Sequence, residues 1–532
     1  MEANCTLVSY AQTGYFSKLV IDYLQQNEKL QSFYKHPVSL EGIKAAIHAR
    51  QQFPQQREVL AQELKKQYEG LPHTSKLDSN IEQLLQPGTF TITTAHQPNI
   101  FTGPLYFIYK ILHTIKLSDT LKQQLPDYNF VPVYYMGSED ADLDELGSIT
   151  IDEIKYTWQT KQTGAVGRMK VDKAFISLMG SMHGQLGVLP FGAEIMELFT
   201  TVYTTGKTIQ QATLELINHL FGEYGLVVVI PDNAALKKLF HSVVEKELTE
   251  QFSHKAVQPT LYALDQLYKV QAGGRELNLF YLIDDKRQRI EIKDSVFKVD
   301  GLEISFTQEE ILVELKEHPE RFSANVILRG VFQETILPDI AFIGGGGELA
   351  YWLELKNVFE AVNVPYPMLV LRNSFLLAED KWKQKTEAIG LHLQNLFLSE
   401  HELMNKVVAQ QSNNHFSLNG ELKKVEDLYD QMSLTAANVD TTLQNHVAAL
   451  KVKAIKRLQE LEKKMLRAEK RKFETERNQL HKIKTALFPN NGLQERVENL
   501  SGIYGRYGKE IINIFFLHSL SLEQQFAIVT IK

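Results

Sequence analysis

The chain of 532 residues contains a single cysteine, Cys5, so the sequence excludes an intramolecular disulfide and any metal cluster built on several cysteine ligands. Glycine and proline are also sparse, at 30 and 16 residues, which argues against a collagen-like or low-complexity chain. No apolar run approaches the roughly 20 residues that a membrane-spanning helix needs. We therefore expect a globular, cytoplasmic protein without a membrane partner, and the scarcity of cysteine fits that reducing compartment.

Neither sign of charge is in large excess, because the formal net charge is only -7. Positive charge is concentrated between Lys451 and Lys484, and the rest of the chain is mildly acidic. A dedicated nucleic-acid binder would carry a basic footprint that dominates its domain. We therefore expect no nucleic-acid partner and interpret the basic stretch as the solvent-exposed face of a helix.

Five short segments rich in apolar or β-branched residues predict a parallel sheet, and they occupy residues 89–94, 131–136, 226–230, 339–343 and 368–371. The third segment is continuously apolar, as is typical of a strand that is covered on both faces. Strands that alternate with helices across short polar loops indicate a doubly wound α/β fold. The gaps at about 155–210 and 255–335 are too long for simple crossovers, so we expect inserted subdomains there.

Helical segments flank this core of residues 86–375, with an N-terminal helical segment over 1–85 and a longer helical domain over 376–488 that is nearly free of glycine and proline. The helical domain over 376–488 contains a heptad stripe, that is, apolar residues at heptad spacing along one face of a helix. The stripe consists of Leu443, Val447, Leu450, Ala454, Leu461, Met465 and Ala468. Such a narrow stripe packs against another helix, and two partners are open: the 380–410 helix of the same chain, or a second subunit. Residues 489–532 return to mixed character and are expected to pack on the core.

Polar loops follow the predicted strands, and ligands of open α/β sheets bind beyond the carboxyl ends of the strands. The candidate residues are His96, Gln97, Asn99, Thr102, Gly103 and Tyr106 after the first strand, Asp140 and Asp142 after the second, Asp232 after the third, and Gly344, Gly345, Gly346, Gly347 and Glu348 after the fourth. Their convergence predicts a binding site at this edge of the sheet.

For three of these loops, both functional and structural interpretations stay open. The four glycines leave N–H groups free at a helix N-terminus, which suits a phosphate or carboxylate, or they form only a tight turn. Gly345, Gly347 and Ala350 match the dinucleotide pattern G-x-G-x-x-A, although no acidic residue follows about 20 positions later. His96 is a hydrogen-bonding or acid–base candidate or a structural residue. Asp140 and Asp142 suit Mg²⁺, a substrate amine, or a solvated loop.

Four segments together resemble a known family: TTAHQPNIFTGPLYFIYKILHTIKL, GSEDADLDEL, HPERFSANVILRGVFQETILPDIAFIGGGGELAYWLELKNVF and IYGRYGKE. They are similar to the cysteine-adding enzymes, or cysteine ligases, of bacillithiol biosynthesis, in the same order over nearly the whole chain. The resemblance implies a Rossmann-like core with two connecting-peptide insertions and a coiled-coil domain that forms a homodimer. It also implies that cysteine is added, through an amide bond, to the glucosamine amine of glucosaminyl malate.

The resemblance extends to class I synthetases and so implies nucleotide binding, with ATP activating cysteine and Mg²⁺ as an added requirement. On that model His96 and Asp140 are the catalytic candidates, the His96 loop and the four glycines hold phosphates, and Asp140 or Asp142 binds an amine or a metal. The remaining substrate-binding candidates are Asn325, Arg321 and Arg329, the two arginines as partners of the malate carboxylates.

No KMSKS-type loop is recognisable, so another acyl donor or energy source stays open. Two other functions also stay open. One is a different nucleotide-dependent enzyme, such as an NAD(P) oxidoreductase that uses the glycine turn. The other is a non-catalytic coiled-coil scaffold, whose function would depend on the heptad stripe and not on the polar loops.

Overall fold

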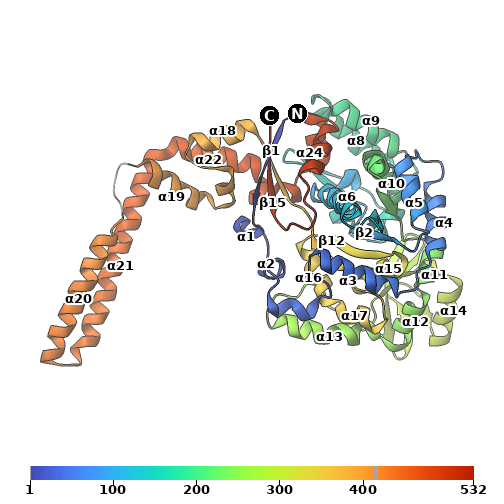
Figure 1. Cartoon of the computed structure of the whole chain (residues 1–532), viewed down its shortest axis with the longest axis horizontal. Coiled ribbons are helices and arrows are strands. Elements are labelled where there is room, and N and C mark those ends of the chain that lie inside the picture. Colours follow the sequence, from blue (N-terminus) through green and yellow to red (C-terminus); the bar gives the residue numbers. More distant parts are fainter. Residues whose placement is uncertain (1, 413–416) are drawn as a thin grey trace. The chain divides into compact units, whose positions relative to one another are not determined.

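The structure, a computed structural model, describes residues 2–412 and 417–532, and these form two compact units. The first unit comprises Ala3–Leu376 and Gly492–Val529 (Figure 1). The second comprises Leu377–Asn491 with Glu2 and Thr530–Lys532. Residues 413–416, which belong to the predicted helical region 376–488, lie outside the described residues.

A five-stranded parallel sheet forms the centre of the first unit, with the strand order β13-β12-β2-β3-β6. The strands are β2 (Thr89–His96), β3 (Asn129–Met136), β6 (Val227–Val229), β12 (Asp339–Gly344) and β13 (Met368–Leu371). They coincide with the five apolar segments of the sequence, so the predicted parallel α/β core is confirmed.

The central strand β2 carries threonines into the core, and the hydroxyl groups of Thr91 and Thr93 have hydrogen-bond partners there. Thr91 and Thr93 both donate hydrogen bonds to Oδ1 of Asp339 on the neighbouring strand, at 2.9 and 2.6 Å. A buried hydroxyl without a partner would cost free energy, so this pairing lets a β-branched polar strand lie at the centre of the sheet. Around it pack apolar side chains from α3 (Leu40–Gln51) and α6 (Tyr106–Gln124).

The N-terminal segment is mostly helical, with α1 (Tyr10–Thr13), α2 (Lys18–Leu24), α4 (Arg57–Tyr68) and α5 (Ser75–Gln83) in addition to α3. It begins, however, with the strand β1 (Ala3–Val8). This strand belongs to a sheet of order β1-β15-β14, with β14 (Phe375–Glu379) and β15 (Phe526–Ile531). Local sequence could not reveal it, because its neighbour β15 lies at the other end of the chain.

The two long gaps between core strands contain further helices and strands. Between β3 and β6 lie α7 (Leu143–Leu146), the hairpin of β4 (Ser148–Ile151) and β5 (Ile154–Thr157), α8 (Lys173–Leu186), α9 (Gly192–Val202) and α10 (Ile209–Phe221). Between β6 and β12 lie helices α11 (Ala234–Leu239), α12 (His241–Glu250), α13 (Phe252–Asp265), α14 (Gln308–Glu317) and α15 (Val326–Ile336). The same segment forms an antiparallel sheet of order β10-β9-β8-β7-β11.

That second sheet contains β7 (Leu279–Ile283), β8 (Lys286–Lys293), β9 (Val296–Val299), β10 (Ser305–Phe306) and β11 (Phe322–Ala324). After β12 the chain forms α16 (Gly346–Glu354) and α17 (Lys356–Ala361) before it enters β13. Near the C-terminus, α23 (Leu500–Tyr507) and α24 (Glu510–His518) belong to the first unit together with the sheet.

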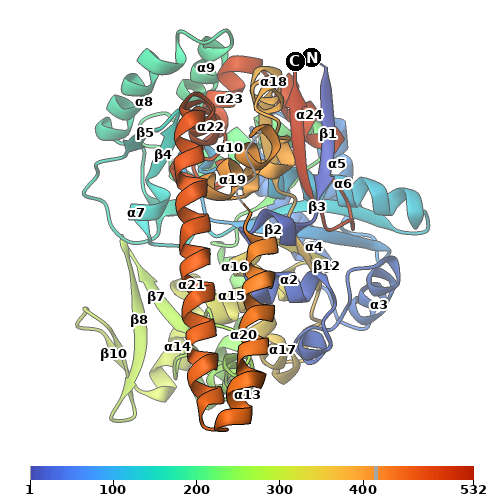
Figure 2. The ribbon, with the colours of Figure 1, turned by 90° about the vertical axis from the view of Figure 1, so that its left-hand side faces the viewer.

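The second unit contains α18 (Asp380–Ala388), α19 (Glu400–Gln411), α20 (Asn419–Val439), α21 (Leu443–Lys470) and α22 (Glu474–Leu487). Helices α20 and α21 lie side by side as an antiparallel hairpin, and α21 carries the heptad stripe (Figures 1 and 2). The prediction that the 380–410 helix is the stripe's main partner within the chain is therefore wrong. The partner is the helix that immediately precedes α21, because the short turn between them brings the two together.

The hairpin leaves much of its apolar surface exposed. Of the seven heptad residues only Val447 is buried, and Leu450 and Leu461 remain 37% and 46% exposed. Across the described parts of the chain, no helix is both long and apolar enough to cross a membrane.

Candidate active site at the carboxyl edge of the sheet

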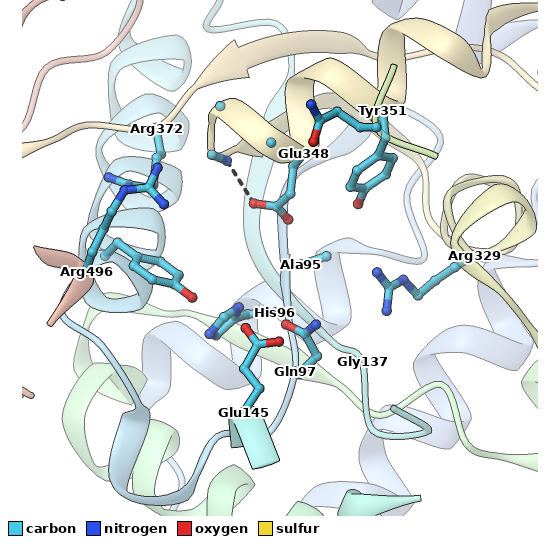
Figure 3. Close-up of a pocket in the computed structure, with 15 residues that line it drawn as sticks. Ala95, His96, Gln97, Gly137, Glu145, Arg329, Glu348, Tyr351, Arg372 and Arg496 are labelled. Carbon is cyan, nitrogen blue, oxygen red and sulfur yellow. Dashed lines mark hydrogen bonds between the residues drawn. The ribbon is translucent and has the colours of Figure 1, made fainter. Parts of the chain in front are cut away.

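A cavity of about 370 Å³ lies at the carboxyl ends of the parallel strands. Residues from the ends of β2, β3, β12 and β13 line it, together with side chains from α15, α16 and the segment after residue 491 (Figure 3). The lining residues are Ala95, His96, Gln97, Tyr106, Gly137, Glu145, Gln271, Arg329, Gly345, Gly346, Gly347, Glu348, Tyr351, Arg372 and Arg496. Three of the four loops that the sequence predicted to converge, those after β2, β3 and β12, thus contribute to one cavity, and the loop at Asp232 does not.

His96 ends β2 and is only 7% exposed. Its ring packs against those of Phe107 and Tyr106, with centroid distances of 4.7 and 5.4 Å. Burial, assisted by the positive charges of Lys110, Arg329 and Arg372, lowers the pKa of His96 well below its usual value. The imidazole is therefore neutral at physiological pH and a weak base, which suits it to form a hydrogen bond but not to donate a proton from a cation.

The glycine loop meets a carboxylate of its own chain. Gly345 donates its backbone N–H to Oε2 of Glu348 at 2.8 Å, which caps the N-terminus of α16. The fully buried Lys110 of α6 holds the same carboxylate, with Nζ 2.9 and 2.7 Å from its two oxygens. A phosphate bound at this helix would therefore share the N-terminus with the Glu348 carboxylate.

The acidic loop after β3 places its carboxylates in three different settings. Asp140 accepts a hydrogen bond from Nε2 of Gln97 at 3.2 Å and lies 3.6 Å from Nη1 of Arg329. Asp142 caps α7, because its Oδ1 accepts the N–H of Glu145 at 3.2 Å. Glu145 lines the cavity, and burial together with Asp142 and Asp140 raises the pKa of its carboxyl group.

Glu145 was not among the residues singled out from the sequence, although it lies in the acidic run that was. The run contains several carboxylates, and only the turn of α7 decides which of them is directed into the cavity (Figure 3). Tyr351, Arg372, Arg496 and Gln271 were missed as site residues for another reason. They come from segments far apart in the sequence, and no local motif marks them.

Several predicted residues support the site without lining the cavity. Asn99, Thr102 and Gly103 form a buried turn, with φ values of 75° at Thr102 and 62° at Gly103. Nδ2 of Asn499 fixes this turn by donating to the carbonyl oxygens of Phe101 and Gly103, at 2.7 and 2.6 Å. The turn therefore sets the direction in which the chain leaves β2 for α6.

Asp232 and Arg321 also lie outside the lining of this cavity. Asp232 forms a two-point ion pair with Arg168, in which both N–O distances are 2.6 Å. Arg321 pairs with Glu314 at 2.6 Å. Asp232 is therefore committed to a contact with the first insertion, and Arg321 to a contact within the second.

A second cavity, of about 460 Å³, adjoins the first and shares Gln271, Arg329 and Tyr351 with it. The predicted residues Asn325 and Asp140 line this second cavity, and Arg329 lines both. Within the described part of the chain, no group of three or more His, Cys, Asp or Glu side chains is placed to hold a metal ion.

Comparisons with known proteins agree with this architecture. Residues 1–373 match the family model "Bacillithiol biosynthesis BshC, N-terminal Rossmann-like domain", and residues 375–531 match "Bacillithiol biosynthesis BshC, C-terminal coiled-coil domain". A protein of Flavobacterium johnsoniae is 39% identical over 100% of both chains, and one of Christiangramia forsetii is 40% identical over 100% of this chain and 99% of its own. One of Cytophaga hutchinsonii is 40% identical over 91% of both chains, and all three bear the name "Putative cysteine ligase BshC".

Proposed function

Because this chain belongs to the bacillithiol biosynthesis BshC family, we propose that it is a cysteine ligase that joins the carboxyl group of cysteine to the amine of glucosaminyl malate. The bond formed is an amide between carbon and nitrogen. One observation carries the proposal: a carboxylate, Glu145, and the guanidinium groups of Arg329 and Arg496 line one cavity at the carboxyl edge of the sheet. The carboxylate is complementary to a substrate amine, and the guanidinium groups are complementary to a substrate carboxylate.

Glu145 is the candidate partner of a substrate amine. Its side chain is directed into the cavity and forms no ion pair with any residue in the ranges 2–412 and 417–532 (Figure 3). The raised pKa of its carboxyl group brings it closer to neutral pH, where a general base is most effective. An ammonium group must lose a proton before its nitrogen can attack a carbonyl carbon, and Glu145 is placed to accept that proton.

His96 and Asp140 have different parts in this proposal. The neutral His96, which lines the cavity, contributes a hydrogen bond there. Asp140 acts as a positioning residue, since it holds both Gln97 and Arg329 toward the cavity. The ion-paired Arg372, bound to Glu495 at 2.8 Å, forms a rigid wall beside the ring of Tyr106.

ATP is the proposed source of energy, and when bound it would convert the cysteine carboxyl group to an acyl adenylate with loss of pyrophosphate, AMP leaving when the amine attacks. The residues present fit a nucleotide in part. Gly346 and Gly347 line the cavity with backbone at the N-terminus of α16, but Glu348 occupies the N–H of Gly345. Mg²⁺ bound to the phosphates needs only one or two protein carboxylates, and Asp140 can provide one.

A homodimer formed through the α20–α21 hairpin is part of the same proposal. Leu434, Val439 and Val452 are 69%, 80% and 66% exposed on this hairpin. Apolar side chains at such exposure on a two-helix hairpin are typical of a surface that a further helix covers.

The proposal is tested by incubating the purified chain with cysteine and glucosaminyl malate, with and without ATP and Mg²⁺, and measuring products by mass spectrometry. We expect a product with the mass of both substrates less one water, only when ATP is present, and one AMP for each product. Product without ATP would keep the ligase and reject the adenylate. Absence of product with all components present, from a protein that binds cysteine, would reject the ligase itself.

A further inference from the structure

The second cavity is lined on one side by the antiparallel sheet of the second insertion and on the other by the start of α15. It joins the first cavity where Gln271, Arg329 and Tyr351 line both. A ligand long enough to pass these three residues would therefore have one end in each cavity.

The charges around the second cavity are mainly positive. Four guanidinium groups line it, those of Arg275, Arg287, Arg289 and Arg329, against a single carboxylate, Asp140. In the described ranges of the chain, Arg275, Arg287 and Arg289 form no ion pair, and Arg329 lies 3.6 Å from Asp140. Positive groups gathered in this way repel one another, so an anionic ligand that lies among them is stabilised.

Arg287 is held in a fixed orientation at the centre of this group. Its guanidinium group lies 3.8 Å above the ring of Phe280, and its Nε donates to Oγ of Ser323 at 3.1 Å. Its Nη2 donates to the carbonyl oxygen of Ala324 at 3.3 Å. Burial lowers the pKa of Arg287 although the carboxylates of Glu139 and Asp140 raise it, and Arg329 lowers it further. An anionic ligand would act in the same direction as the two carboxylates.

The other surfaces of the cavity indicate what kind of anion fits. Asn325 and Val326, at the start of the 11-residue helix α15, line it and add the positive end of a helix dipole. Leu277 and Leu279 give it an apolar wall. Guanidinium groups match the planar geometry of carboxylates with paired hydrogen bonds, and an apolar wall suits the short carbon chain between two carboxylates.

We infer that the second cavity binds the two carboxylates of a small dicarboxylate, namely the acid end of the acceptor substrate. This inference rests on the proposed function, in which the acceptor is a glucosaminide of malate. The acid end lies among Arg275, Arg287 and Arg289, the sugar passes Arg329, and the amine reaches the first cavity beside Glu145. The arginines of the β-sheet insertion thereby determine which amine is used as acceptor.

The kinetic test uses Arg289→Gln and Arg275→Gln, because both side chains are exposed and their loss leaves the core intact. Lys298→Gln is the matched control, since Lys298 is an exposed cation on the adjacent strand β9 outside the cavity. We expect KM for glucosaminyl malate to rise about tenfold or more in the arginine variants with little change in kcat. Methyl glucosaminide, which lacks the acid, should be used equally by all variants. Equal losses with both acceptors, or no loss with either, would overturn the inference.

A binding test separates this inference from the proposed function. Calorimetry with malate, acetate and inorganic phosphate needs no catalysis. We expect malate to bind the unmodified chain and the Lys298→Gln variant, and to bind Arg289→Gln about tenfold more weakly. Acetate should bind more weakly than malate. If malate binds but no ligase product forms, the proposed function fails and the dicarboxylate site stands. If phosphate binds and malate does not, the site is not one for dicarboxylates.

Discussion

Individual side chains in the first cavity owe their chemistry to their surroundings more than to their type. His96 is neutral because the protein buries it among cations, and Glu145 holds its proton more tightly because it is partly buried beside two aspartates. A histidine and a glutamate can be read from the sequence, but these surroundings cannot, because Lys110, Arg329 and Arg372 reach His96 from three separate segments.

The role of Glu145 can be tested with one substitution and a neighbour as control. Glu145→Gln removes the carboxylate and keeps the shape, so we expect kcat to fall about 100-fold, the usual cost of losing a positioned general base. Asp144→Asn, on the same turn but outside the cavity lining, should keep kcat within about twofold. The measurement is the steady-state rate of product formation. Equal rates for the two variants would show that Glu145 does not take part.

Glu354 predicts a pH dependence of stability. Its buried carboxylate accepts the N–H groups of Gln271 and Ala272, at 2.7 and 3.0 Å, and burial raises its pKa from 4.5 to about 7. Between pH 4.5 and about 7, the Glu354 carboxyl group keeps its proton in the folded chain and releases it in the unfolded chain. The protonated Glu354 therefore stabilises the folded chain below pH 4.5, and this stabilisation is lost as the pH rises toward 7. The loss amounts to roughly 3 kcal/mol.

Urea unfolding from pH 4.5 to 8 measures this effect in the unmodified chain and in Glu354→Gln. The free energy of unfolding of the variant should decline less with rising pH over this range. Glu360→Gln, an exposed glutamate on α17, serves as the control and should follow the unmodified chain. Parallel curves for all three proteins would contradict the assignment to Glu354.

At the scale of elements, the strands and the loops that follow them were predictable and the contents of the insertions were only partly so. The five core strands were found because each is a short run of apolar or β-branched residues between helical segments. The strands β7 and β8 were expected only as part of an insertion. The strand β1 and the hairpin partner of α21 were not found, because pairing between segments is set by tertiary contacts that local patterns do not contain.

The glycine loop before α16 gives a prediction at this scale, because its members differ in the space around them. A Cβ atom at Gly344 would lie 2.8 Å from a ring carbon of Phe342, whereas one at Gly347 would meet nothing within 4 Å. Gly344→Ala should therefore lower the free energy of unfolding by about 1–3 kcal/mol.

Gly347→Ala should fold normally and, if a ligand lies against this backbone, raise the KM for ATP severalfold. Thermal unfolding and steady-state kinetics measure the two effects. A normal KM in Gly347→Ala would place the phosphates away from this turn, and a normal stability of Gly344→Ala would contradict the steric argument.

At the scale of the whole molecule, the exposed apolar residues of the α20–α21 hairpin predict the oligomeric state. We expect a dimer by light scattering, and a monomer when Leu434 and Val452 are both replaced by glutamate, because burying two unpaired carboxylates at an interface is strongly unfavourable. Val188→Glu, at a position that is 83% exposed outside the hairpin, should leave the dimer intact. A monomer in the unmodified chain at micromolar concentration would contradict this prediction.

The most direct test of the central claim, that the cavity at the sheet edge makes the cysteinyl amide, is made in cells that lack the gene for this chain. Mass spectrometry of their extracts should show glucosaminyl malate accumulating and bacillithiol absent. The unmodified chain and Asp144→Asn should restore bacillithiol, and Glu145→Gln should not. Normal bacillithiol in the deletion strain would contradict the claim that this chain is the ligase. Full restoration by Glu145→Gln would contradict the claim that the reaction takes place in this cavity.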